Sequence, residues 1–378
     1  MKYLYFFLNC IAILSTLPAQ SFGINMFIEH WLSEFQTDRI TLSVIWLIAS
    51  SISGIFVIFN GYILDKIGVK LSIRIVYPIY IVSVWLMSYA INIYQLAVLI
   101  CLMRIFGPES IGTITFVSNC NLFNENRGKM FSIFSLLDWL FIAAPSLLNI
   151  LITNNGWRNT YIYISTVVTA FLMPSIFFIR NVKKVVDESS ETESKPFNWV
   201  IYLHLIFNNM VFALFWSGSN IHAVDYYSKL TTYEVANTIY LPIPFGLAIG
   251  SLCTGYYIDK LKDQYKIDLL AFAQFILSII IFFSMFVIPR TAILFGLIYG
   301  IFVGIQITSY NVIYPCVFGT ENLGKIQAFS NGLVMLCMGL GPTLFSMCKK
   351  YNGDYELCIQ GITITLFVSS CILISKKL

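Results

Sequence analysis

Three ionisable side chains, Arg104, Glu109 and Asp138, lie in otherwise apolar stretches of the sequence. A charge at bilayer depth is expensive, so an ionisable residue there is a candidate for function. The planar guanidinium of Arg104 could bind both oxygens of a carboxylate, and Asp138 would offset its charge until that carboxylate arrives. Glu109 follows Pro108, where a helix is expected to kink, and a desolvated carboxyl there could exchange a proton. A structural ion pair between Arg104 and Asp138 is the open alternative.

Uncharged polar side chains also fall near the middle of apolar stretches. Some of them could line a central cavity between helices. For any single residue the alternative is an interhelical hydrogen bond, worth about 0.6 kcal/mol. The candidates are Gln20, Asn25, Asn208, Asn209, Gln306, Tyr310, Asn311 and Asn331. Of these, Gln20, Asn209, Gln306 and Asn311 join the three ionisable residues as candidate binding residues.

The elements that hold these residues must be membrane-spanning helices. Of the 378 residues 58% are apolar and 11% are charged, whereas a soluble domain is about half apolar and a quarter charged. A span needs about 20 apolar residues, so the chain accommodates about twelve, and each must be a helix because no water satisfies an open backbone. The expected spans are 4–28, 41–64, 71–91, 94–120, 129–152, 157–180, 198–224, 233–257, 267–288, 292–317, 326–347 and 355–375.

The charged, Ser-rich stretch 181–197 divides the sequence into 1–180 and 198–378. We expect six helices in each part and a cytoplasmic linker between them. Lys and Arg fall mostly on the side of the N-terminus, which predicts that both termini are cytoplasmic. The first apolar run could also be a cleaved signal peptide, but it resumes through Phe27 and is long enough for a retained span.

Short motifs recur in the two parts of the chain. The stretch 61–66 (GYILDK) follows the second expected span, and 255–260 (GYYIDK) follows the eighth. Likewise 125–129 (ENRGK) follows the fourth span, and 321–325 (ENLGK) follows the tenth. Because the matches keep their order along the chain, they predict an internal repeat of two six-helix units with the same orientation.

These residues resemble the major facilitator superfamily over essentially the whole chain. Its signature G-x-x-x-D-[RK]-x-G-[RK]-[RK] is met by Gly61, Asp65, Lys66, Gly68 and Lys70. The resemblance implies an all-α membrane protein with twelve transmembrane helices in two six-helix bundles related by a pseudo-two-fold repeat. It also implies that the aspartate caps a neighbouring helix when the cytoplasmic side is shut. The implied gating residues are Gly61, Asp65, Lys66, Gly68, Asp259 and Lys260.

A finer resemblance points to the monocarboxylate porter and oxalate–formate antiporter branch. The stretch 18–23 (PAQSFG) looks like its first span, and 156–158 (GWR) looks like its entry to span six. Proton-coupled members of this branch carry a lysine in the first span and an Asp/Arg pair in the eighth. Here the only cation near the first span is Lys2, and 233–257 contains no Arg or Lys. The cargo chemistry of the branch therefore does not carry over as a whole.

The sequence predicts a secondary active or facilitative transporter that moves a small polar metabolite by alternating access, with a small organic anion such as a monocarboxylate favoured. The alternatives are an amino acid or cationic solute, because two buried acids face one buried base, and a transporter-like receptor that does not translocate. We expect a monomer in a lipid bilayer, with a coupled proton as an optional partner of the small-molecule substrate.

Other chemistries find little support in the sequence. The three histidines are too far apart to propose a metal site, and the nine cysteines form no CxxC pair. No basic run suggests nucleic acid, and no polar cluster suggests an intramembrane enzyme. The stretch 319–325 fits the phosphate-loop pattern G-x-x-x-x-G-K, but Ile326 follows it and a membrane span precedes it. No cofactor is therefore expected.

Overall fold

The computed structural model describes residues 2–20, 23–24, 26–123, 126–179, 198–231, 242–319 and 322–375. All regular elements in these ranges are helices. In chain order they are α1 (Lys2–Leu14), η1 (Leu17–Ala19), α3 (Ile28–Phe35), α4 (Arg39–Ile67), α5 (Val69–Met87), α6 (Ile93–Arg104), η2 (Ile105–Ile111), α7 (Gly112–Leu122), α8 (Arg127–Ser135), α9 (Leu137–Phe178), α10 (Trp199–Leu230), α12 (Pro242–Ile258), α13 (Asp263–Phe283), η3 (Ser284–Phe286), α14 (Ala292–Phe318), α15 (Leu323–Asn352) and α16 (Glu356–Ser375).

Ten helical segments within the described ranges are long and apolar enough to cross a membrane. Two expected spans are not among these ten. The eighth corresponds to α12, of which 17 residues are described, and the fifth is divided between α8 and the start of α9. The prediction of an all-helical, multi-pass membrane protein is confirmed. The predicted linker 181–197 lies outside the described residues.

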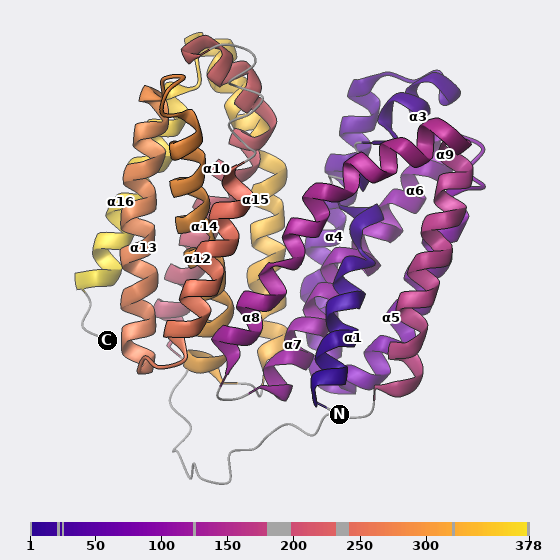
Figure 1. Cartoon of the computed structure of the whole chain (residues 1–378), viewed down its shortest axis with the longest axis horizontal. Helices are drawn as coiled ribbons and strands as arrows, with labels where there is room; N and C mark the ends of the chain where they lie inside the picture. The colour runs from indigo at the N-terminus through magenta and orange to yellow at the C-terminus, as the bar shows by residue number, and fades with distance from the viewer. Residues whose placement is uncertain are drawn as a thin grey trace. The chain divides into compact units, whose positions relative to one another are not determined.

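The chain folds as two compact units, whose helices are labelled in Figure 1. Unit 1 comprises Met1–Asn124, Leu137–Glu188 and Thr320–Gly332, and unit 2 comprises Glu125–Leu136, Ser189–Gly319 and Leu333–Leu378. Each unit therefore includes one short segment that is flanked in the chain by residues of the other unit. Unit 2 holds α8, which packs on α12 and α14, and unit 1 holds the first turns of α15.

In unit 1 the long helix α9 is two helices joined at a bend. Gly156 has φ 75° and ψ 160°, values outside the helical range that favour glycine. The next two residues anchor the bend: Trp157 Nε1 and Arg158 Nη2 each donate a hydrogen bond of 2.5 Å to the carboxylate of Glu34 on α3. Arg158 also donates to the carbonyl oxygens of Ser88, at 2.8 Å, and Ala90, at 2.7 Å. The sequence 156–158 thus ties α9 to α3 and to the end of α5.

In unit 2 the closest helix pair is α12 with α14. A Cβ added at Gly250 would lie 2.0 Å from the carbonyl oxygen of Ile301, and one added at Gly300 would lie 2.1 Å from that of Ile243. Only glycine permits backbones to approach this closely, as in the small-residue faces of membrane helices.

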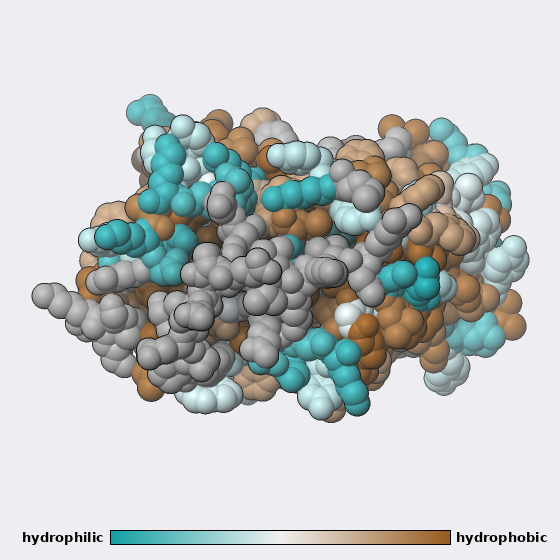
Figure 2. Space-filling model, turned by 90° about the horizontal axis from the view of Figure 1, so that it is seen from below, coloured by the Kyte–Doolittle hydropathy of each residue, from teal (hydrophilic) through white to brown (hydrophobic). Residues whose placement is uncertain are grey.

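Large apolar side chains remain exposed on the outer faces of the helices. On α4, for example, Ile48, Ile55 and Phe59 are each more than half exposed. Figure 2 views the molecule from below and shows hydrophobic side chains interspersed with hydrophilic ones on that face. A soluble domain rarely leaves so much apolar surface uncovered, whereas a membrane protein requires it.

Candidate functional site

The fourth span breaks in its middle, beside the first candidate residues. The α-helix α6 ends at Arg104, the π-helical segment η2 runs from Ile105 to Ile111, and α7 continues from Gly112. Within η2, Gly107 has a non-helical ψ of −107° and is followed by Pro108, which has no N–H to donate. The predicted kink is confirmed. Single π turns inside α-helices are frequent at functional sites.

The wide turn brings Arg104 and Glu109 together. A π-helix closes its hydrogen bonds over five residues, so side chains five apart share a face. Arg104 Nη2 lies 3.2 Å from Glu109 Oε1, and both side chains are buried, with 6% and 4% of their surface exposed. Ser110 Oγ donates to the carbonyl oxygen of Ile105 at 2.6 Å, which spans the same interval.

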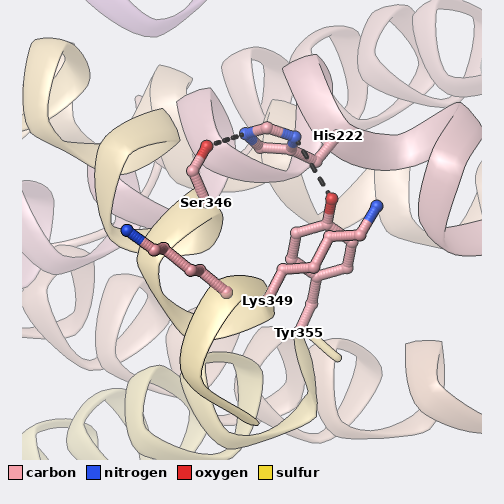
Figure 3. A pocket seen from close by; sticks show the side chains of 5 residues that line it. His222, Ser346, Lys349 and Tyr355 are labelled. Carbon is pink, nitrogen blue, oxygen red and sulfur yellow. Dashed lines mark hydrogen bonds between the residues drawn. The ribbon is translucent and has the colours of Figure 1, made fainter. Parts of the chain in front are cut away.

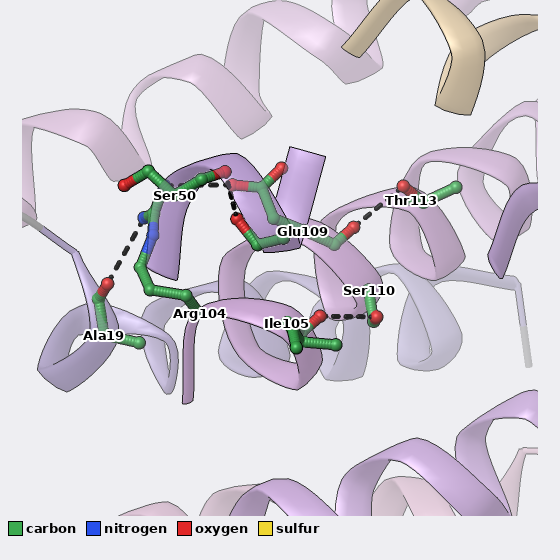
Figure 4. Close-up of polar contacts among 8 residues, drawn as sticks. Ala19, Ser50, Arg104, Ile105, Glu109, Ser110 and Thr113 are labelled. Atoms are coloured by element: carbon green, nitrogen blue, oxygen red, sulfur yellow. Dashed lines mark hydrogen bonds and ion pairs between the residues drawn. The ribbon is translucent and has the colours of Figure 1, made fainter. Parts of the chain in front are cut away.

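The Arg104 guanidinium has further neighbours in unit 1 (Figure 4). Nη1 donates to the carbonyl oxygen of Ala19 at 3.3 Å, and the Trp46 ring centroid lies 4.8 Å from Cζ, a cation–π contact. Figure 4 places Ser50 of α4 beside the pair. The site therefore combines a buried guanidinium, a carboxylate, an aromatic face and a hydroxyl.

The structure gives Arg104 a partner that the sequence did not propose. Glu109 contacts its guanidinium, whereas the sequence suggested Asp138. Asp138 lies in α9, and its side chain is outside the described residues, so its role stays a prediction. The interval of five residues across Gly107 and Pro108 was the signal that could have identified Glu109 as the partner. Trp46 and Ser50 had no such signal.

The uncharged candidates are divided between the two units. In unit 1, Gln20 follows η1 and is half-buried, and Asn25 lies outside the described residues. In unit 2, Asn209 of α10 and Asn311 of α14 are half-buried. Gln306 of α14 is only 1% exposed, and neither amide atom has a hydrogen-bond partner among the described residues. A buried amide without partners costs free energy unless water or a ligand satisfies it.

Tyr310 makes interhelical hydrogen bonds, which was the alternative to a binding role. Its hydroxyl donates to the carbonyl oxygen of Leu205 on α10 at 3.2 Å and accepts from Gln274 Nε2 on α13 at 2.6 Å. Tyr310 thus connects three helices of unit 2 and has a structural role. Asn208 likewise donates to the carbonyl oxygen of His204 at 3.1 Å, within its own helix.

The signature aspartate caps the start of a helix in unit 1. Asp65, at the end of α4, accepts hydrogen bonds from the backbone amides of Gly324, at 3.1 Å, and Lys325, at 2.8 Å, in the first turn of α15. The first amides of a helix have no partner within it, and the helix dipole favours a negative charge there. The stretch that fits a phosphate-loop pattern therefore holds a carboxylate. Gly68, with φ 82°, ends α4 directly after this motif.

Unit 2 contains the same arrangement. Asp259 accepts from the amides of Gly128, at 2.6 Å, and Lys129, at 3.0 Å, at the start of α8. Lys260 extends over the ring of Tyr256, with Nζ 4.0 Å from the centroid, while Lys66 is exposed. The second copy of the signature has Lys262 at the position of Gly68, yet its aspartate accepts from the equivalent pair of backbone amides.

Glycines allow the two capping contacts. A Cβ at Gly61 would lie 2.3 Å from the carbonyl oxygen of Gly324, and one at Gly128 would lie 2.7 Å from that of Gly255. A larger residue would push each helix start away from its aspartate. Among the described residues, no group of His, Cys, Asp and Glu could hold a metal ion.

Comparisons with known proteins agree on the fold. The sequence model of the Major Facilitator Superfamily matches residues 8–342. The uncharacterized MFS-type transporter YcxA of Bacillus subtilis (strain 168) is 22% identical over 248 residues, which are 61% of this chain and 59% of that protein. The matched region thus spans less than two thirds of that relative.

Among solved structures, the human organic anion transporter MFSD10 (TETRAN) superposes with a TM-score of 0.75 at 9% identity, over 98% of this chain and 99% of that one. The MFS transporter FucP in the outward conformation superposes with a TM-score of 0.72 at 13% identity, over 99% of both chains. A variant of the E. coli fucose:proton symporter FucP gives 0.69 at 14% identity, over 98% and 99%. At these identities the likeness concerns the fold alone. The predicted fold of two six-helix bundles agrees with these structures.

Proposed function

Because the chain belongs to the Major Facilitator Superfamily, a family of membrane transporters, we propose that it moves a small organic anion, such as a monocarboxylate, by alternating access. The observation that carries this proposal is the buried guanidinium of Arg104 in the broken fourth span. Arginine binds a carboxylate through two parallel hydrogen bonds, which gives both affinity and orientation. Trp46 provides an apolar and cation–π face beside it.

Glu109 gives the same site a route to proton coupling. A cargo carboxylate that takes the guanidinium leaves Glu109 buried without its counter-charge, which is costly. Protonation of Glu109 removes that charge. One anion and one proton then enter together, and the net charge of the site is unchanged. The further contributors to the binding site are Gln20, Asp138, Asn209, Gln306 and Asn311, with the unsatisfied amide of Gln306 as the strongest of the uncharged ones.

A second candidate cargo is an amino acid. The buried pair offers one positive and one negative group 3.2 Å apart, and a zwitterion carries one charge to match each. The structural relatives do not choose between cargo classes, because one is described as an organic anion transporter and another as a fucose:proton symporter. A receptor that binds without translocating is the remaining alternative. The resemblance to the monocarboxylate porter branch favours the anion.

The capping contacts of Asp65 and Asp259 stabilise one state of the transport cycle. Support comes from the two capping contacts: each copy of the repeated motif places one aspartate at the start of a helix. A contact that is made in just one conformation raises the population of that conformation. In this proposal both termini and the linker 181–197 face the cytoplasm, residues 1–180 and 198–378 form the two bundles, and the monomer is the transporting unit. Reporter fusions at Val185 and at the C-terminus should report the same side, and opposite sides would exclude this topology.

Counter-flow uptake by the purified protein in proteoliposomes tests the cargo. A panel of monocarboxylates, amino acids and sugars should show exchange for carboxylates first. Arg104→Lys keeps the charge but removes the two-pronged contact, so it should lower the affinity for the carboxylate about tenfold or more. Arg74→Lys, at an exposed arginine of α5, is the matched control and should transport normally. Unchanged carboxylate affinity in the Arg104 variant would place the binding site elsewhere.

A further inference from the structure

Unit 2 contains a pocket that the transport site does not use (Figure 3). Its volume is about 460 Å³. The described residues that line it are His222 of α10, Ser346, Lys349 and Lys350 of α15, and Tyr355 just before α16. Two lysines, a serine, a tyrosine and a histidine thus line one open pocket, and its described lining contains no acidic side chain.

His222 fixes the shape of the pocket. Its Nε2 lies 3.1 Å from the carbonyl oxygen of Pro342 and 3.1 Å from Ser346 Oγ, and its Nδ1 lies 3.3 Å from the Tyr355 hydroxyl. A carbonyl oxygen only accepts, so Nε2 must donate to Pro342, and in the neutral ring Nδ1 accepts from Tyr355. The imidazole also stacks parallel to Phe345, at 6.5 Å and 3°. One ring therefore holds α10, α15 and the start of α16 in place.

The cations approach the pocket from different directions. Successive residues on an α-helix point about 100° apart, so Lys349 and Lys350 extend to different sides. Lys349 Nζ lies 5.5 Å from the Tyr355 ring centroid, and Lys350 Nζ lies 5.7 Å from that of Tyr351. Lys349 thus lies over a ring that lines the pocket, and Lys350 lies over a ring that is not among the described lining residues.

Two acids near the pocket do not line it. Asp354 and Glu356 flank Tyr355 in the chain, and neither belongs to the described lining. Asp354 Oδ1 accepts from the backbone amide of Glu356 at 3.0 Å, at the start of α16. That carboxylate is therefore already directed to a helix terminus, where it has a local role. The excess charge of the pocket lining stays positive.

We propose that this pocket binds a phosphate group, with Lys349, Lys350 and the Ser346 hydroxyl as its ligands and His222 as a positioning residue. Ammonium groups bind phosphate as point charges, and a hydroxyl supplies a further donor. Donors that arrive from several directions suit a tetrahedral oxyanion, whereas a planar carboxylate is matched by the arginine fork. The phosphate belongs either to a free anion or to an anionic lipid headgroup. The site is independent of the cargo proposed for Arg104, which lies in unit 1.

Thermal unfolding of the full chain in neutral detergent, with inorganic phosphate as the probe and constant ionic strength, tests the site. The unfolding temperature should rise with phosphate and saturate. Lys349→Gln/Lys350→Gln should abolish the rise, and Lys229→Gln, at an exposed lysine of α10, should retain it. An equal rise in the double variant, or no rise in the unaltered protein in detergent or in nanodiscs, would overturn the proposal. Ser346→Ala, which keeps the charges of Lys349 and Lys350, should weaken apparent phosphate affinity several-fold. This variant tests the site if the double variant does not fold.

Nanodiscs separate the two sources of phosphate. With phosphatidylcholine alone, inorganic phosphate should stabilise the protein as it does in detergent. If an anionic lipid occupies the pocket, discs that contain phosphatidylglycerol should stabilise the unaltered protein and remove its response to phosphate, and both effects should vanish in the double variant. If free phosphate is the ligand, the response should persist in both kinds of disc. Either result supports the pocket as a phosphate site.

Discussion

Asp65 and Asp259 make the same contact in the two units of the molecule. Each carboxylate accepts hydrogen bonds from two consecutive backbone amides in the first turn of a helix: those of Gly324 and Lys325 for Asp65, and those of Gly128 and Lys129 for Asp259. Besides the glycines that permit the close approach, the contact uses one side chain, the aspartate, and two backbone amides. This explains how the second copy can lose part of the signature and keep the interaction.

Replacement of Asp65 by Asn should therefore slow transport while leaving cargo affinity nearly unchanged. The amide cannot supply the negative charge that the helix terminus favours, a loss of about 0.3–1 kcal/mol, so turnover should fall about two- to fivefold. Asp259→Asn should act in the same way. Counter-flow kinetics measure both quantities, and a collapse of affinity with normal turnover would show that the gating role is misassigned.

A matched control for these variants exists in the same chain. Asp38 also caps a helix, α4, where its Oδ1 accepts from the Thr41 amide at 2.7 Å. Asp38→Asn should alter stability slightly and leave turnover unchanged, since this contact lies within one stretch of sequence and belongs to no repeated motif.

The buried pair of Arg104 and Glu109 predicts a pattern of charge rescue. Removal of either charge alone leaves the other buried without this counter-charge, which should cost about 3–5 kcal/mol. Arg104→Gln/Glu109→Gln should therefore unfold at a higher temperature than either single variant. A stable double variant without carboxylate binding supports the cargo role of Arg104, and full transport of an anion by it excludes that role.

Asp138 provides the comparison for this rescue. Glu109 contacts the guanidinium directly, so we predict that Arg104→Gln/Asp138→Asn recovers less stability than the double variant at Glu109. The measurement is the same thermal unfolding. Equal recovery would show that the two acids share the positive charge.

Two glycine substitutions, one at the contact between α12 and α14 and one on α16, should change stability in opposite directions. Gly250→Ala should destabilise the protein by about 1–3 kcal/mol, because its Cβ would lie 2.0 Å from the carbonyl oxygen of Ile301. Gly361→Ala on α16 meets no atom within 4 Å and should stabilise by up to about 1 kcal/mol through helix propensity. Unfolding temperatures measure both changes, and destabilisation by the α16 substitution would contradict this account.

Glu34 predicts an acid-sensitive contact at the bend of α9. Partial burial raises the pKa of Glu34, but hydrogen bonds from Arg158 and Trp157 outweigh it, and the pKa is lowered overall. A carboxyl with a lowered pKa stabilises the fold above its unfolded-state pKa, and that contribution is lost as the pH falls through the folded-state pKa. Glu34→Gln should thus lower the unfolding temperature at neutral pH and have no effect under strongly acidic conditions. The half-exposed pair should contribute about 0.2–1 kcal/mol. A difference in unfolding temperature between the variant and the unaltered protein that did not change with pH would assign the effect to packing.

Sequence patterns predicted most of the spans and the kink at Pro108, because these depend on apolar length and backbone chemistry. The capping role of the repeated aspartate was implied by the resemblance to the superfamily. The partner of Arg104 was harder to predict. An α-helical spacing does not place a residue five positions away on the same face, and only the π turn does so. Neighbours supplied by distant segments, such as Trp46 for Arg104 and Gln274 for Tyr310, leave no periodic signal in the sequence.

The exchange of short segments between the two units has a consequence for biosynthesis. Asp65 and its amide partner Gly324 are separated by 259 positions in the chain. Since the ribosome makes the N-terminal residues first, the helix start that Asp65 caps does not yet exist while most of unit 1 inserts into the membrane. The cap can close only after translation has reached α15, and a fragment that ended before α15 would leave this carboxylate without its amide partners.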